Sequence, residues 1–531
     1  MSHKRSWVWN YFKHNDEDYE VECNVCAKRL KFSKCTTNMI KHAKIHGVFK
    51  KAIIDKLILN LITVDLRPVS IVEDTGFKSL LNFLDPKYKL PTRKTLKTML
   101  DERYIEEKMR VREQLQNVDK ICITTDTWTS INSDSFLTKF TGSHTASTIA
   151  NHLDETFITW DMQNKIIAVV TDNAANMRAA TKQLRVSSDH VSCFAHTLNL
   201  IIKHCLDNIV EIQILREKCR RIVSFFKSSC LVTNKLNEVQ VMLGLLQYKL
   251  KSEVPTRWHA TYEMFERLLK LKSSIVIALL SLEINFEKLT DREWDVLPNV
   301  IQILQPFFFI TEELSSEKYV SISKIVLIKK QLYIFIHSFQ DNGGITGTLC
   351  TELRLQLNKY LHNYETNKKY SIPALLDPRF RKLSFHNETF ATQTYNELIN
   401  IATPLETSTT ESTAHRIVSQ ETVTEEVSSF WSIFDTQVFQ KNTIVCKSCI
   451  SAELNSYVKE PYLPRHENPL TYWKANALKY PILSKLAKEH LCVMATSVPS
   501  ERVFSKTDEI INKKRYRLKD NVVNKILFLN R

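Results

Sequence analysis

Two cysteines and two histidines near the N-terminal end have the residue types and spacing of zinc ligands. Cys23 and Cys26 are two residues apart in the pattern Cys-x-x-Cys, and His42 and His46 follow in the pattern His-x-x-x-His. Thiolate and imidazole ligands in two such pairs, about 15 residues apart, can complete a tetrahedron around one Zn²⁺. We therefore predict a structural zinc site formed by these four residues.

The residues around the ligands predict a small module with a ββα arrangement. Residues 27–33 alternate polar with apolar side chains, as a strand does, and residues 36–46 place both histidines on one helix face. A segment of about 50 residues buries too little apolar surface to fold alone, so the metal is expected to supply the missing stability. Trp7, Trp9 and Phe12 precede the first cysteine, and they fit a small core better than stacking on bases.

Cationic side chains crowd the same module and indicate a polyanionic partner. Lysine and arginine residues gathered in this way neutralise phosphates and release counterions, so double-stranded DNA is the expected partner. The candidates for DNA contact in the module are Lys28, Arg29, Lys31, Lys34, Lys41 and Lys44.

Two aspartates could carry a different chemistry further along the chain. Asp126 and Asp172 each follow a short β-branched run, residues 120–125 and 165–171, that is typical of a strand buried on both faces. If the two strands are neighbours, the carboxylates converge at the edge where open α/β sheets place their sites, and Mg²⁺ or Mn²⁺ suits such ligands. Aspartate after a strand is also a common helix cap, and this alternative stays open.

The composition is that of a basic, mostly helical chain with several domains. At 531 residues the chain is too long for one core, and its net charge of +15 favours nucleic acid as the partner. The twelve cysteines are scattered, no signal-peptide pattern opens the sequence and no apolar run reaches membrane-spanning length. We therefore expect a reduced, intracellular protein without membrane contact. A basic cluster at residues 513–517 agrees with nuclear import.

Several motifs resemble, in their order along the chain, those of hAT-superfamily transposases with a BED-type zinc finger. The resemblance runs from the finger to the C-terminal end. The motifs are Trp7-Val8-Trp9-x-x-Phe12 with the finger ligands, residues 65–73, Thr125-Asp126-x-Trp128-Thr129, Thr171-Asp172-Asn173-x-x-Asn176, Cys193-x-x-His196-x-x-Asn199, Arg257-Trp258, Leu376-Asp377-Pro378-Arg379 and Ser500-Glu501-Arg502-Val503-Phe504-Ser505.

The resemblance implies roles for individual residues. Asp126, Asp172 and Glu501 would together hold two divalent ions, Mg²⁺ or Mn²⁺, for cleavage and joining of DNA. Trp258 would stack on a displaced base near the cut, and a core tryptophan is the competing interpretation. Cys193 and the histidine three residues after it are taken as structural, supporting the floor of the active site.

The expected fold is multidomain α+β and mostly helical. The resemblance implies an RNase H-like α/β core that is interrupted by a large all-helical insertion, and a C-terminal segment that completes the core and dimerises. The regions are a BED-type zinc finger at 1–50, a helical DNA-binding region at 51–118, the first part of the core at 119–203, the insertion at 204–402, a flexible linker at 403–430 and the C-terminal region at 431–531.

The interval between the first two acids is short for an RNase H-like core. Such a core needs two antiparallel strands and then a helix there, and a helix at residues 145–160 leaves only residues 127–144, little more than the length of one hairpin. Residues 131–134 are turn-like and residues 142–144 are polar, so this stretch is also poor strand material. We therefore predict that most of the second and third strands are missing. Because misplacing a catalytic group by an ångström can lower a rate about a hundredfold, cutting activity is expected to be absent or nearly so.

The resulting hypothesis is a zinc-dependent nuclear DNA-binding protein that derives from an hAT transposase. It would act as a homodimer in transcription or chromatin regulation. The alternatives are an active transposase that uses the three acids with divalent ions, and a helical scaffold for protein partners. Cys446-x-x-Cys449 also has metal-pair spacing, but without a second pair we interpret it as two ordinary cysteines.

Overall fold

The structure is a computed structural model, and it divides into two compact units. It describes residues 7–15, 20–24, 26–32, 35–45, 48–126, 128–129, 135–136, 145–282, 286–315, 320–339, 343–418, 449–502 and 520–530. Unit 1 comprises Met1–Asn117, Thr127–Thr141 and Arg502–Arg531, and unit 2 comprises Val118–Asp126 and Gly142–Glu501. Among the described residues, every helix is too short or too polar to span a lipid bilayer.

The N-terminal module of unit 1 is a three-stranded antiparallel sheet with one helix. Its elements are η1 (Trp7–Tyr11), β1 (Phe12–Asn15), β2 (Glu20–Cys23), β3 (Arg29–Lys31) and α1 (Thr37–Ile45). The predicted strand and helix are thus confirmed as β3 and α1, but the sheet has three strands where the predicted ββα arrangement has two, because residues 12–15 add β1. Phe12 is buried, and the rings of Trp9 and Phe32 meet edge to face with centroids 5.0 Å apart. The aromatic residues before the first cysteine therefore belong to a small core, as predicted.

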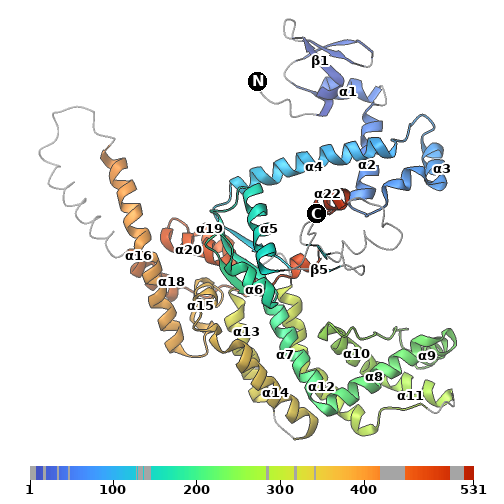
Figure 1. The fold of residues 1–531 in the computed structure, drawn as a ribbon, viewed down its shortest axis with the longest axis vertical. Coiled ribbons are helices and arrows are strands. Elements are labelled where there is room, and N and C mark those ends of the chain that lie inside the picture. The colour runs from blue at the N-terminus through green and yellow to red at the C-terminus, as the bar shows by residue number, and fades with distance from the viewer. Residues whose placement is uncertain are drawn as a thin grey trace, which may run out of the picture. The chain divides into compact units, whose positions relative to one another are not determined.

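The rest of unit 1 is helical, and its core joins the two ends of the chain. The elements are α2 (Val48–Thr63), η2 (Val69–Glu73), α3 (Thr75–Leu84), α4 (Arg93–Gln116), the short pair β5 (Trp128–Thr129) and β6 (Ser135–Phe136), and α22 (Asp520–Leu529). Val523 of α22 packs in one apolar cluster with Ile58 of α2 and Leu96 of α4. An ion pair between Lys525 and Asp101 (2.6 Å) fixes α22 along α4, and Figure 1 shows the two helices next to each other.

Unit 2 contains a parallel sheet that confirms the two predicted strands. β4 (Ile121–Thr124) pairs with β7 (Ile166–Thr171), and β7 pairs with β8 (Asp189–Ser192), all in parallel. The helices α5 (Ala146–Thr159) and α6 (Ala175–Lys182) connect these strands. The described parts of residues 127–144 are β5 and β6, which pair with each other, and the remainder of that interval lies outside the described residues.

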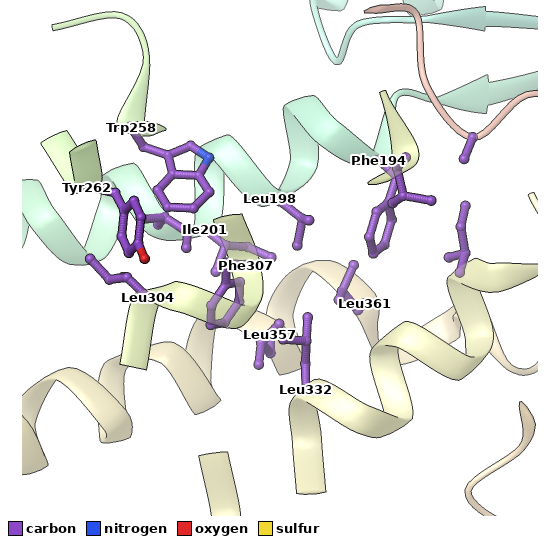
Figure 2. Close-up of a cluster of buried hydrophobic side chains, with 14 of the residues drawn as sticks. Phe194, Leu198, Ile201, Trp258, Tyr262, Leu304, Phe307, Leu332, Leu357 and Leu361 are labelled. Carbon is purple, nitrogen blue, oxygen red and sulfur yellow. The ribbon is translucent and has the colours of Figure 1, made fainter. Parts of the chain in front are cut away.

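Long helices make up most of unit 2 and share one apolar core with the sheet. They are α7 (Phe194–Asn208), α8 (Val210–Ser228), α9 (Cys230–Met242), α10 (Trp258–Lys270), α11 (Lys272–Ser281), α12 (Asp291–Leu314), α13 (Lys324–Ser338), α14 (Gly344–Leu361), η3 (His362–Tyr364), α15 (Lys368–Leu376), η4 (Arg381–Ser384), α16 (Glu388–Val418), α18 (Cys449–Lys459), α19 (Pro469–Ala475) and α20 (Pro481–Leu491). Figure 2 shows Trp258 and Tyr262 of α10 beside Ile201 of α7 and Leu304 of α12. The same cluster includes Leu483 of α20 and Val170 of β7.

The segment predicted as a flexible linker is helical in its first part. α16 continues through residue 403 to Val418, and residues 419–448 lie outside the described part. Ala391, Leu398 and Ala402 are buried, so the first turns of α16 are held by packing. Extending an established helix costs much less than starting one, and this explains why a sequence rich in Ser, Thr and Glu follows the helical path.

Candidate zinc site and acidic residues

A tight turn between β2 and β3 positions the two cysteines of the finger. Cys23 ends β2, its N–H donates to the carbonyl oxygen of Lys28 (3.0 Å), and its own carbonyl oxygen accepts from the N–H of Ala27 (2.8 Å). Ala27 adopts a left-handed φ of +54°. This backbone path turns the chain within four residues, so that Cys26 comes back toward the thiol of Cys23.

Helix α1 brings His42 to the same point. The ligand atoms of Cys23, Cys26 and His42 all lie within 4.8 Å of one another, and Cys26 Sγ is 3.2 Å from His42 Nε2. Bonds of about 2.3 Å to sulfur and about 2.0 Å to nitrogen in a tetrahedron place such atoms roughly 3.5 Å apart. Phe12 packs edge to face against the His42 ring, with centroids 6.1 Å apart, and so supports the ring's orientation. The donor set and its spacing therefore fit zinc.

The fourth predicted ligand and part of the cationic surface lie outside the described residues. His46 and Lys34 are not described, and nothing is described of the Lys44 side chain, although its backbone belongs to α1. Lys28, Arg29 and Lys41 are exposed on the same module. Arg29 lies 3.6 Å from Glu22 in an ion pair that leaves 60% of the arginine side chain exposed. A cationic surface accompanies the ligand cluster.

The first two acids follow neighbouring strands at the same end of the sheet. In the parallel ladder Thr124 of β4 lies opposite Val170 of β7, and Asp126 and Asp172 each come two residues later. Asp172 Oδ1 also accepts a hydrogen bond from the N–H of Ala174 (3.2 Å) just before α6. The two predicted strands are thus neighbours and both aspartates follow their carboxyl ends, and Asp172 also has the turn-forming role of the alternative interpretation.

The C-terminal segment of unit 2 returns to this end of the sheet. The hydroxyls of Ser500 and Thr124 are 2.9 Å apart, and Phe194 donates its N–H to the carbonyl oxygen of Ala495 (2.8 Å). Glu501 is therefore attached to the end of β4 through its neighbour Ser500. The side chain of Glu501 is exposed. The resemblance implied that the C-terminal segment completes the core, but no local pattern identifies the contact between Ser500 and Thr124, which joins residues 376 positions apart.

Cys193 fastens this segment to the start of α7. Its buried Sγ accepts from the backbone N–H of Ser497 (3.3 Å) and from that of His196 (3.5 Å). Burial raises the pKa of the thiol, and the charge of Glu501 adds to the increase. The thiol is thus a neutral acceptor that caps α7 and holds the returning chain, which agrees with the predicted structural role.

His190 is a polar residue at this end of the sheet that the sequence did not single out. It lies on β8, and its Nε2 is 2.9 Å from the hydroxyl of Thr171, the residue before Asp172. Burial lowers the pKa of His190, and the nearby cations Lys369 and Arg178 lower it further. A neutral imidazole therefore supports the backbone that carries Asp172.

The three acids do not form a compact ligand group. Asp126, Asp172 and Glu501 are all among the described residues, and within these the one group of three or more ligand atoms that lie within 4.8 Å of one another is that of the finger. Of the remaining candidates, Cys446 and residues 513–517 lie outside the described part.

Trp258 lies in the helical core. It begins α10, is 3% exposed, and donates its backbone N–H to the side-chain oxygen of Asn199 (3.3 Å). Its indole Nε1 is buried and has no hydrogen-bond partner in the described part of the chain. This position fits the interpretation of Trp258 as a core residue. The hydrogen bond also links the Arg257-Trp258 motif to Asn199, the last residue of the Cys193-x-x-His196-x-x-Asn199 motif.

A cavity of about 780 Å³ lies at the opposite end of the sheet from the acids. Its lining includes the residues before or at the starts of the strands, such as Lys120 and Asp189. The charged groups there are paired with each other: Lys120 with Glu489 (3.2 Å) and Lys369 with Asp189 (3.1 Å). The cavity is therefore separate from the carboxyl-end residues.

Three family models match separate parts of the chain. The model of the BED zinc finger matches residues 6–44, that of the ZBED1 RNase-like helical domain matches 191–303, and that of the hAT family C-terminal dimerisation region matches 453–531. The first match contains Cys23, Cys26 and His42, and the last contains Glu501.

Similar proteins come from animals, plants and fungi. Zinc finger BED domain-containing protein 4 of Homo sapiens is 27% identical over 91% of this chain and 44% of its own length. Putative AC transposase of Zea mays is 23% identical over 96% of this chain and 68% of its own length. Putative transcriptional regulator tpeD of Talaromyces stipitatus is 23% identical over 94% of this chain and 65% of its own length. The chain thus spans less than half of the first of these relatives.

These matches confirm the resemblance that the motifs indicated. The chain carries a BED zinc finger and an hAT dimerisation region, and its relatives are zinc finger BED domain-containing proteins and hAT transposases.

Proposed function

We propose that this protein is a zinc-dependent, nuclear protein that binds double-stranded DNA as a homodimer and regulates transcription or chromatin. The observation that carries the proposal is the cluster of Cys23, Cys26 and His42 in a module with an exposed cationic surface. The names of the relatives, which include a putative transcriptional regulator, agree with it.

The finger would bind DNA through helix α1 and the turn that carries the cysteines. Cys23, Cys26 and His42 would hold the zinc ion, with His46 as the fourth ligand, and the metal would stabilise a module whose core is small. Asn38 and Lys41 are exposed three residues apart on α1, so they share one exposed face, and this face would enter the major groove. Lys28 would contact phosphate.

Dimerisation through the C-terminal region would place two fingers on one DNA. The match to an hAT dimerisation region at residues 453–531 supports this arrangement. A two-fold symmetric protein favours paired half-sites, so selection of binding sites from random DNA is expected to yield repeated or palindromic sequences.

The test compares Cys23→Ser with Cys35→Ser in the full chain. Both cysteines lie in the finger, but Cys35 is exposed and not part of the ligand group. We expect Cys23→Ser to lose bound zinc and at least about a hundredfold in affinity for a selected duplex, measured by fluorescence anisotropy, because the fold depends on the metal. Cys35→Ser should behave as the unmodified protein does. Unchanged DNA binding by zinc-free Cys23→Ser would refute the proposal.

A second candidate function, DNA cleavage with Mg²⁺ or Mn²⁺, is supported by the contact between Ser500 and Thr124. This contact brings the segment of Glu501 to the strand end that Asp126 follows. The test is nicking of supercoiled plasmid in Mn²⁺ by the natural chain and by Asp126→Ala, Asp172→Ala and Glu501→Ala, with the exposed acid variant Glu211→Ala as the control. Cleavage that each of the three variants abolishes and the control retains would establish this function. Absence of nicking by folded, DNA-binding protein would count against it.

A further inference from the structure

Helix α3 of unit 1 carries large apolar side chains on a face that nothing described covers. Leu80, Phe83 and Leu84 are 54%, 84% and 64% exposed, and their spacing of three and four residues places them on one stripe. Phe77 and Leu81 of the same helix are partly buried and pack against the core of unit 1. By the helical period they share a face with Leu80 and Leu84, so the inner part of this apolar face holds the helix and its outer part, with Phe83 at the edge, stays exposed.

Such a stripe differs from the other exposed apolar residues of unit 1. On α4, Ile105 and Met109 are also exposed, but they stand among charged residues such as Glu106, Lys108 and Arg110. A pair of apolar residues in a charged setting is ordinary on protein surfaces, whereas a larger group of adjoining ones marks contact surfaces. Phe83 in particular exposes most of an aromatic ring, the kind of side chain that anchors protein interfaces.

The surroundings of the stripe are strongly cationic. Between residues 75 and 97 the chain has six lysine or arginine residues and one acid, Asp85. All six cations are exposed, and Arg93 pairs with Glu73 (2.5 Å). The other five make no ion pair with any residue that the structure describes; they are Lys78, Lys87, Lys89, Lys94 and Lys97. Lys87 and Lys89 follow Leu84 within five residues, so positive charge lies next to the C-terminal end of the stripe.

We propose that the α3 stripe, formed by Leu80, Phe83 and Leu84 with its cationic border, docks an acidic amphipathic helix of another protein. An apolar face on the partner would pack along the stripe, and its carboxylates would meet the lysines. A second copy of this surface is disfavoured because the same charges would face each other. Nucleic acid would use the lysines but would leave most of the apolar stripe unmatched. The small area predicts a weak complex that salt weakens further.

The probe for the test is a fluorescein-labelled synthetic helix of about 20 residues with leucines along one face and glutamates elsewhere. Its binding to the zinc-loaded full chain is measured by anisotropy. We expect Leu80→Ser combined with Phe83→Ser to weaken binding about tenfold or more. The matched pair Ile105→Ser with Met109→Ser on α4 removes similar exposed apolar surface and should change nothing. Circular dichroism checks that both double variants keep their helices.

Three outcomes would overturn the proposal. The first is equal weakening by the α4 pair. The second is equal binding of a peptide with the same composition in scrambled order, because charge alone would then explain the complex. The third is that the α3 pair loses affinity for a DNA duplex by the same factor as for the peptide. Cys23→Ser is expected to keep peptide binding, so failure of the finger proposal and failure of this one are distinguishable.

Discussion

The finger and the helical body of unit 2 stabilise their folds by different means. Among its described residues the finger buries six apolar side chains, namely Val8, Phe12, Val21, Cys23, Met39 and Ala43. Unit 2 instead buries a large continuous cluster that reaches from the sheet to α20, and further apolar side chains of α5 and α6 are also buried. A core as small as that of the finger cannot offset the entropy of ordering the chain, whereas the larger core can.

Unit 2 buries several charged groups in its large core, whereas the core of the finger is too small to hold such groups. Asp377 and Arg379 form a buried ion pair (2.7 Å). Arg381 is fully buried and donates to the carbonyl oxygens of Tyr457 (2.8 Å) and Glu460 (2.6 Å), at the C-terminal end of α18. Carbonyls at a helix end lack partners within the helix and carry partial negative charge, so the guanidinium caps α18 from a distant part of the chain.

The two regions therefore respond differently to their surroundings. The finger depends on a ligand that can be removed, so its proposed DNA binding is open to control by zinc. The C-terminal segment of unit 2 is attached by internal hydrogen bonds and apolar packing, which no small molecule supplies. Measurements on the zinc site and on the buried polar groups of unit 2 can test this contrast.

Removal of zinc by a strong chelator should have the largest effect. Because zinc contributes about 10 kcal/mol or more to the folding of such modules, hydrogen exchange in residues 7–45 should become fast. Exchange in α7 and α12 should stay slow, since their protection comes from the core. Mass-spectrometric hydrogen exchange measures both regions in one sample. If the finger stays protected without metal, the contrast fails.

Arg381→Met should be the most damaging single change in the buried charges of the body. It leaves several buried carbonyl oxygens without donors, and we expect a loss of about 3–5 kcal/mol in the free energy of unfolding. The control is Arg465→Met, because Arg465 is exposed and pairs with Glu313 at 3.5 Å. An exposed pair of this kind contributes less than about 1 kcal/mol. Urea titration followed by circular dichroism measures the free energy of unfolding of both variants. Equal losses in Arg381→Met and Arg465→Met would contradict the prediction.

The sequence predicted the local features of both regions well. The spacing of Cys23, Cys26 and His42 indicated the zinc site because metal geometry restricts ligand spacing. β4 and β7 were predicted because each is a short, apolar, β-branched run, and an aspartate follows each run. Both predictions rest on a few neighbouring residues, whose types and spacing indicate the local structure.

The features that the sequence did not predict all depend on long-range contacts. The packing of α22 against α2 and α4 joins opposite ends of the chain. The role of Arg381 depends on carbonyls about 80 residues away, and no local pattern marks them. The extension of α16 past residue 402 depends on packing that stabilises its first turns. For the acids, the positions of Asp126 and Asp172 follow from strand pairing, but that of Glu501 depends on the returning segment.

Cys193→Ala should have a smaller effect that is confined to the returning segment. The variant removes the acceptor of the N–H groups of Ser497 and His196, and one buried group without a partner costs about 1–3 kcal/mol. Cys193→Ser keeps an acceptor and should restore most of the loss. Hydrogen exchange in residues 493–501 reports the local change. Equal protection in the alanine and serine variants would show that the thiol does not hold this segment.

The smallest expected effect is a pH dependence at Glu460, the carboxylate beside the end of α18. Burial alone would raise the pKa of Glu460, but hydrogen bonds from Lys479, Tyr472 and Tyr480 lower it to about 2. A carboxyl whose pKa is lower in the folded chain than in the unfolded chain stabilises the fold above the unfolded value, about 4.5. That contribution is lost as the pH falls from there toward about 2.

Glu460→Gln isolates this contribution, because glutamine keeps the shape but does not titrate. The urea midpoint of the natural chain should exceed that of the variant at pH 7, and the difference should shrink as the pH falls from about 4.5 toward 2. The exposed acid variant Glu211→Gln should show no such convergence. A constant difference at every pH would mean that Glu460 acts through packing and not through its charge. Polar attachment of the C-terminal segment would then rest on Arg381 rather than on a network that includes this carboxylate.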